Sequence, residues 1–89
     1  MNGIEKNWTV YILRCADSTL YTGITDDLER RLSMHNAGKG AKYTRGRGPV
    51  QLCYAQMCES KGAALRREYE IKSMSREQKL KLITNYAME

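Results

Sequence analysis

Hydrophobic positions near the start of the chain follow the pattern of β structure. Residues 8–15 (WTVYILRC) are β-branched, aromatic and aliphatic and contain neither Gly nor Pro, which indicates a buried strand. Residues 16–18 (ADS) have turn chemistry, and residues 20–24 (LYTGI) form a second predicted strand. Two strands separated by so few residues can only pair as an antiparallel hairpin.

A helical pattern follows the hairpin. Leu28 and Leu32 lie four residues apart on one helix face, so this helix can pack on the sheet. Either Thr25 or Asp26 can cap its start, and Gly38 is placed to end it.

The second half of the chain predicts one more strand and two more helices. The strand covers residues 50–58, with Val50, Leu52 and Tyr54 on one face. Ser60 caps a second helix, and Ser75 begins a capping box for a third, with fraying expected from Asn85 onward. Apolar positions of the second helix are Ala63, Ala64, Leu65 and Ile71. The order strand, strand, helix, strand, helix, helix predicts an α/β or α+β domain, single over residues 1–89, with a core of about 8–83.

Charge is concentrated in one stretch of the chain. Fifteen Lys and Arg against ten Asp and Glu give a formal net charge of +5. Residues 38–49 are Gly-rich and lack acidic residues, and they carry Lys39, Lys42, Arg45 and Arg47. Solubility alone could explain a basic protein, but a cation cluster on flexible backbone suits a polyanion such as nucleic acid better.

Other features narrow the class of protein. The three cysteines are odd in number and have no CxxC spacing, which argues against a disulfide framework or a zinc cluster and favours a reducing, cytoplasmic setting. No apolar run approaches the length of a membrane span, and the first residues lack the pattern of a signal peptide. No P-loop, GxSxG, HExxH or dinucleotide-binding motif is present.

Two tyrosines flank the predicted hairpin turn almost symmetrically. If the connection has an odd number of residues, Tyr11 lies opposite Gly23, Tyr21 lies opposite Leu13, and both phenols share one face. Gly23 then leaves a gap beside Tyr11 through which a ligand could approach the backbone. An even connection would separate the two phenols, and both tyrosines could simply be packing residues.

Three helical residues could act on a phosphate. Arg31 and His35 are neighbours four residues apart, so Arg31 could hold a phosphate while His35 donates to it or moves a proton. Arg30 is expected to point elsewhere around the helix. Glu68 could hold Mg²⁺ together with substrate phosphate and water, or it could pair with Lys72 at i,i+4.

These residues occur in the order of a known motif. Residues 10–12 (VYI) and 21–23 (YTG) resemble the paired motif of the GIY-YIG nuclease domain. The resemblance continues through residues 28–32 (LERRL), His35, residues 64–68 (ALRRE) and Lys72. The basic segment after the first helix resembles the small YhbQ/YazA-like branch of that superfamily.

The resemblance implies a three-stranded antiparallel sheet with flanking helices and an endonuclease that cuts DNA with one divalent metal, Mg²⁺ or Mn²⁺. Tyr11 and Tyr21 would lie at the scissile phosphate, one of them assisting deprotonation of the attacking water. Arg31 would stabilise charge on the phosphate, His35 would assist, and Glu68 would bind the metal. Close packing at the site would depend on Gly23.

The chain departs from the family pattern at two places. Residues 10–12 are VYI where the family name has GIY, and residues 73–82 contain no Asn, which fuller members carry beyond the metal-binding Glu. The leading hypothesis is an endonuclease acting on branched, damaged or single-stranded DNA in repair, with backbone contacts from Lys39, Lys42, Arg45 and Arg47 that give affinity but little sequence information. The alternatives are a nucleic-acid-binding module without turnover and a protein-interaction module. A protein partner for targeting stays open.

Overall fold

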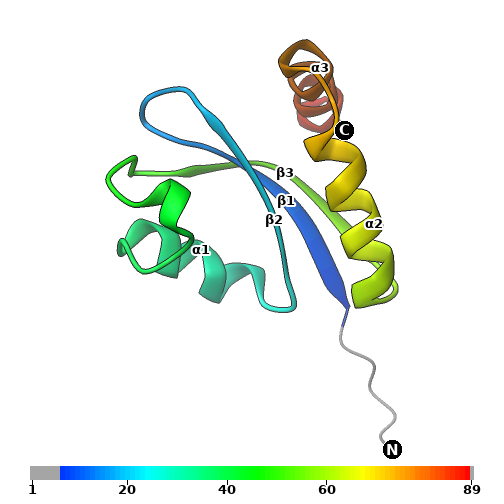
Figure 1. The fold of residues 1–89 in the computed structure, drawn as a ribbon, viewed down its shortest axis with the longest axis horizontal. Helices are drawn as coiled ribbons and strands as arrows, with labels where there is room; N and C mark the ends of the chain where they lie inside the picture. The colour runs from blue at the N-terminus through cyan, green and yellow to red at the C-terminus, as the bar shows by residue number, and fades with distance from the viewer. Residues whose placement is uncertain (1–6, 89) are drawn as a thin grey trace, which may run out of the picture.

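The fold is a three-stranded sheet with helices on both faces (Figure 1), and the computed structural model describes residues 7–88. The sheet has the order β2-β1-β3, and both strand pairs are antiparallel. This α+β architecture and the order of its elements confirm the sequence prediction; the extent of the domain stays a prediction. The elements are β1 (Trp8–Arg14), β2 (Leu20–Thr25), α1 (Leu28–Asn36), the 3-10 helix η1 (Lys42–Thr44), β3 (Gln51–Cys58), α2 (Lys61–Lys72) and α3 (Arg76–Ala87).

The register of the β1-β2 hairpin determines where the two tyrosines lie. Arg14 pairs with Leu20, so an odd number of residues connects the strands. Tyr11 is therefore opposite Gly23, as predicted for a connection with an odd number of residues. Because side chains alternate along a strand, Tyr11 and Tyr21 share one face of the sheet.

The two faces of the sheet carry separate hydrophobic clusters. Figure 1 shows α1 on one side of the sheet and α2 and α3 on the other. On the α1 side, Tyr11 and Leu13 pack with Leu28 and Leu32 of the helix. The cluster under α2 and α3 is built from Val10, Ile12, Tyr54, Ala64 and Ile71. Alternation along β1 thus supplies both cores from a single strand.

A β-bulge in β3 corrects the predicted face of that strand. Ile12 pairs with Tyr54 and Leu13 pairs with Leu52, so the register shifts by one residue at Cys53. Leu52 packs on the α1 side, whereas Tyr54 packs on the opposite side. The prediction that Val50, Leu52 and Tyr54 share one face is therefore wrong, because the extra residue of a bulge reverses the alternation.

The start of α1 differs from the prediction by one or two residues. Asp27 is the N-cap, and its carboxylate accepts a hydrogen bond from the Arg30 backbone N–H at 3.1 Å. Thr25 accepts from the Asp27 N–H at 3.0 Å, so it orders the preceding turn instead of capping the helix. Gly38 follows the last turn with φ +75°, a left-handed conformation that favours glycine and ends the helix as predicted.

Both later helices begin where the sequence predicts. The Ser60 side chain caps α2, and Ser75 and Gln78 form the capping box of α3. Of the apolar positions predicted for α2, Ala64 and Ile71 are buried but Leu65 is 46% exposed.

The chain does not fray at Asn85. Helix α3 continues to Ala87, and the Tyr86 ring packs on Tyr54 with centroids 5.4 Å apart. This aromatic contact gives the last turn a tertiary partner that the sequence pattern did not reveal. Among residues 7–88, no helix has both the length and the apolar character needed to cross a membrane.

Candidate functional site

Three of the predicted site residues touch one another between α1 and the sheet. The Tyr11 hydroxyl lies 3.0 Å from Nε2 of His35. The Tyr21 ring centroid lies 5.3 Å from that of His35 and 6.3 Å from that of Tyr11. The β1-β2 register and the position of His35 in the last turn of α1 bring these groups together.

Burial of the Tyr11 phenol favours its protonated form. Burial raises the pKa of Tyr11 to about 12, with further increases from Tyr21 and from the negative charge of Glu68. The positive charge of Arg31 acts in the opposite direction. At neutral pH the phenol is therefore neutral and can donate a hydrogen bond.

His35 is enclosed by the segment that follows α1. Its side chain is 2% exposed, and its Nδ1 lies 2.8 Å from the Thr44 hydroxyl oxygen, which itself donates to the Ala41 carbonyl at 2.9 Å. Burial lowers the pKa of His35, and the charge of Arg31 lowers it further. A Cβ on Gly40 would lie 2.4 Å from the ring, so only glycine fits there without displacement.

Gly23 leaves room for a protein group rather than for a ligand. A Cβ at this buried position would lie 2.7 Å from the Tyr11 hydroxyl oxygen and 3.0 Å from Cε2 of Tyr21. The gap expected beside Tyr11 is thus filled by the Tyr11 phenol itself. The glycine allows the close packing that the family resemblance implied.

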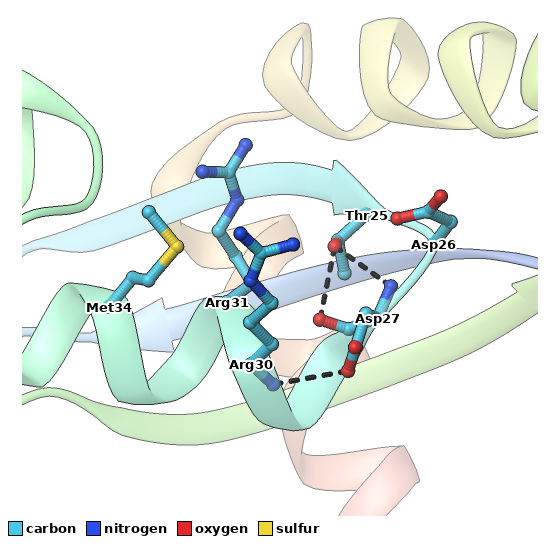
Figure 2. Close-up of a pocket in the computed structure, with 6 residues that line it drawn as sticks. All are labelled: Thr25, Asp26, Asp27, Arg30, Arg31 and Met34. Carbon is cyan, nitrogen blue, oxygen red and sulfur yellow. Dashed lines mark hydrogen bonds between the residues drawn. The ribbon is translucent and has the colours of Figure 1, made fainter.

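Arg31 lines a pocket of about 210 Å³ between the end of β2 and the first turns of α1. Figure 2 shows the guanidinium groups of Arg30 and Arg31 on the same side of α1, both extending toward β2. Arg30 therefore lines this pocket too, contrary to the expectation that it points elsewhere. The other lining residues are Thr25, Asp26, Asp27 and Met34.

Glu68 comes from α2, on the opposite face of the sheet from α1. Its side chain is 19% exposed, and its Oε2 lies 3.2 Å from Nζ of Lys72, which is the i,i+4 pair that the sequence allowed. Its charge nevertheless acts on Tyr11. Glu68 therefore lies near the site but outside the group of direct contacts.

A single carboxylate fits one kind of metal site. Within the described part of the chain, no group of three or more His, Cys, Asp or Glu side chains is placed to hold a metal ion. Mg²⁺ commonly takes one or two protein carboxylates and completes its shell with water and substrate phosphate. The half-buried oxygen donor of Glu68 fits this arrangement, provided that Lys72 gives way.

The basic segment has two parts with different surroundings. Arg47 forms an ion pair with Asp17 of the hairpin turn, and its guanidinium lies 4.5 Å from the Tyr43 ring centroid. Its carbonyl also accepts from the Ala16 N–H at 2.7 Å. Arg47 therefore fastens the segment to the hairpin. The exposed cations of the segment are Lys39, Lys42 and Arg45.

Sequence reasoning missed three residues that surround the site. Thr44 and Gly40 contact His35, and Tyr43 stacks on Tyr21 with centroids 5.9 Å apart. Their segment has only a short 3-10 turn and no hydrophobic periodicity. An uncharged Thr within a cationic, glycine-rich run was the one available signal, and it is weak.

The fold and this site define a GIY-YIG domain. A family model described as the GIY-YIG catalytic domain matches residues 7–81, and the chain belongs to this family. Membership implies a nuclease-like function. Within the family, the chain is similar to small proteins designated UPF0213, in agreement with the small branch suggested by the sequence.

Two of the UPF0213 relatives illustrate the extent of the similarity. The UPF0213 protein of Staphylococcus haemolyticus is 61% identical over 83% of this chain and 90% of its own length. That of Natronomonas pharaonis is 57% identical over 85% of this chain and 89% of its own.

Two solution NMR structures have the same fold. The UPF0213 protein of Bacillus halodurans is 51% identical, with a TM-score of 0.58 over 88% of this chain and 83% of its own. A protein of E. faecalis is 36% identical, with a TM-score of 0.64 over 96% of this chain and 91% of its own.

Proposed function

We propose that this protein is a metal-dependent endonuclease that hydrolyses phosphodiester bonds in DNA. The observation that carries the proposal is the hydrogen bond between the Tyr11 phenol and Nε2 of His35, on the face of the sheet that Arg31 also adjoins. A hydroxyl backed by a proton acceptor, beside a fixed cation, is what water attack on a phosphate diester requires.

Proton transfer follows from the protonation states of the two groups. Because the pKa of Tyr11 is raised to about 12, a free phenolate is scarce at neutral pH. The phenol oxygen instead takes a proton from the attacking water while its own proton passes to Nε2 of neutral His35. The water oxygen bonds to phosphorus, the bond to the leaving ester oxygen breaks, and that oxygen takes a proton from solvent. Tyr21, the other tyrosine of the motif, packs its ring against His35 with centroids 5.3 Å apart.

Charge on the phosphate is balanced from two sides. Arg31 lies on the side of α1 that faces β2, and its guanidinium neutralises charge on a phosphoryl oxygen. Glu68 would hold Mg²⁺ or Mn²⁺ once Lys72 moves away. The Lys72 side chain can move because it is 55% exposed. When bound, the metal stabilises negative charge on the phosphoryl and leaving oxygens.

The exposed cations of the basic segment supply affinity for DNA. Lys39, Lys42 and Arg45 can reach backbone phosphates, whereas the Arg47 side chain is engaged by Asp17 and Tyr43. Phosphate contacts give no direct sequence readout. We therefore propose that the form of the DNA, branched, damaged or single-stranded, governs the choice of substrate, which suits a role in repair with a protein partner for targeting. The three free cysteines favour a cytoplasmic location.

The experiment is cleavage of supercoiled, branched and single-stranded DNA with Mg²⁺ or Mn²⁺. Tyr11→Phe removes the hydroxyl but keeps the ring in place, and Glu68→Gln removes the proposed metal ligand. Glu70→Gln, on an exposed neighbour in the same helix, is the matched control. We expect Tyr11→Phe to lose at least about 10²-fold in rate, the lower end of an acid-base contribution, and Glu68→Gln to lose metal-dependent cleavage. Cleavage that survives Glu68→Gln rejects the assignment.

A second candidate is a nucleic-acid-binding module without turnover. The Glu68–Lys72 ion pair favours it, as does the absence of Asn from residues 73–82. This candidate predicts salt-sensitive binding that Lys42→Glu and Arg45→Glu weaken, with no cut product under any metal. The cleavage assay therefore separates the two.

A further inference from the structure

We propose that Thr44 is a positioning residue that fixes His35 in the tautomer with its hydrogen on Nδ1. Thr44 is the last residue of η1 and is 1% exposed, in a segment whose other residues mostly face solvent. Its catalytic consequence rests on the proposed function, whereas the tautomer itself can be measured without any substrate.

The tautomer follows from counting hydrogens along the chain of contacts. A threonine hydroxyl has one hydrogen, and that of Thr44 is donated to the Ala41 carbonyl at 2.9 Å. Toward His35 the hydroxyl oxygen can therefore only accept. At the 2.8 Å separation, Nδ1 of His35 must carry the hydrogen of the neutral ring.

The other ring nitrogen is then an acceptor. Nε2 carries a lone pair and faces the Tyr11 hydroxyl at 3.0 Å, and the neutral phenol donates to it. The three hydrogen bonds that link Tyr11, His35, Thr44 and Ala41 are all donated in the same direction, from the Tyr11 phenol toward the Ala41 carbonyl. The arrangement leaves Nε2 ready to receive a proton from Tyr11.

The opposite tautomer would block this transfer. Neutral histidine in water favours the hydrogen on Nε2. In that form the ring would donate to the Tyr11 oxygen and could not take its proton. Thr44 therefore reverses the intrinsic preference of the ring through a contact on its far side.

Packing keeps the ring from turning over. A Cβ on Gly40 would be 2.4 Å from Nδ1 of His35, so the backbone lies directly against the ring. Tyr21 packs on another side with centroids 5.3 Å apart. The segment that carries Thr44 is itself tied to the hairpin by Arg47 and Asp17.

Nitrogen NMR tests the tautomer directly, because His35 is the only histidine in the sequence. Two-bond ¹⁵N–¹H correlations of the imidazole distinguish the two nitrogens in the metal-free protein. We expect wild type and Thr44→Ser to show hydrogen on Nδ1, and Thr44→Val to shift toward hydrogen on Nε2. Thr84→Val, an exposed change in α3, is the matched control and should leave the histidine signals unchanged.

Single-turnover DNA cleavage tests the consequence. Thr44→Val should lower the rate by at least about tenfold without weakening DNA binding, and Thr44→Ser should restore it. Hydrogen on Nε2 in the wild type overturns the proposal even if Thr44→Val fails to fold, and so does an unchanged tautomer in a folded Thr44→Val. The expected tautomer with no cleavage by any form rejects the proposed function alone.

Discussion

The substitution Gly23→Ala tests the geometry of the site with a single methyl group. The added Cβ would lie 2.7 Å from the Tyr11 hydroxyl oxygen, which must retreat by roughly 0.7 Å to the 3.4 Å at which ordinary contact begins. The Tyr11 ring is 1% exposed, and its hydroxyl is bonded to His35, so it cannot move without loosening that bond. Overpacking costs about 1–3 kcal/mol. Alanine in a strand recovers roughly 0.5–1 kcal/mol over glycine.

We therefore expect a net loss of about 1 kcal/mol, which lowers the Tm of a domain this size by about 4–8 °C. The cleavage rate should fall by about 10²-fold, because the Tyr11 phenol is displaced from its position. Thermal unfolding and single-turnover cleavage measure the two effects. Gly62→Ala is the control, since its nearest side-chain atom is 3.8 Å away, and it should not reduce either quantity. Wild-type Tm together with wild-type cleavage in Gly23→Ala would refute the packing argument.

Three further predictions concern charge. Because the pKa of His35 is lowered, its neutral form persists at neutral pH. Folding stability, measured by urea unfolding from pH 8 to 5, should decline as the pH falls below the unfolded value of about 6.5, and the cleavage rate should decline only at lower pH, where the folded protein takes up the proton; pH-independent curves would contradict this. Arg30→Ala should weaken DNA binding and reduce the slope of log affinity against log salt concentration by about one. An equal effect from Arg66→Ala on α2 would show that only net charge matters. Lys72→Ala should tighten Mn²⁺ binding by at most about fivefold, measured by electron paramagnetic resonance, and no change would mean that the pair does not compete with metal at Glu68.

Local rules predicted the elements of the fold well. The hairpin and the capping residues Ser60 and Ser75 depend on neighbours within a few residues, and the structure confirms them. The bulge at Cys53 could not be predicted, because it arises from pairing between β3 and a strand about forty residues away. The first residue of α1 could not be predicted either, because Thr25, Asp26 and Asp27 are adjacent and each has a side chain that can cap a helix.

Regular spacing suggested candidate site residues, and the resemblance to the GIY-YIG motif selected among them. Hairpin symmetry pointed to Tyr11 and Tyr21, and i,i+4 spacing pointed to Arg31 and His35. Thr44 reaches His35 through a turn with no periodic pattern, so tertiary structure alone reveals its contact.

The ion pair between Arg47 and Asp17 has a consequence for how the protein meets a polyanion. A glycine-rich segment that moved freely would lose conformational entropy on binding, and that loss would subtract from affinity. Here the ion pair, the Tyr43 contact and the bond from Ala16 already hold the segment against the hairpin. These contacts order part of the segment during folding, so under the proposed function a phosphate backbone would meet cations on a partly preorganised support.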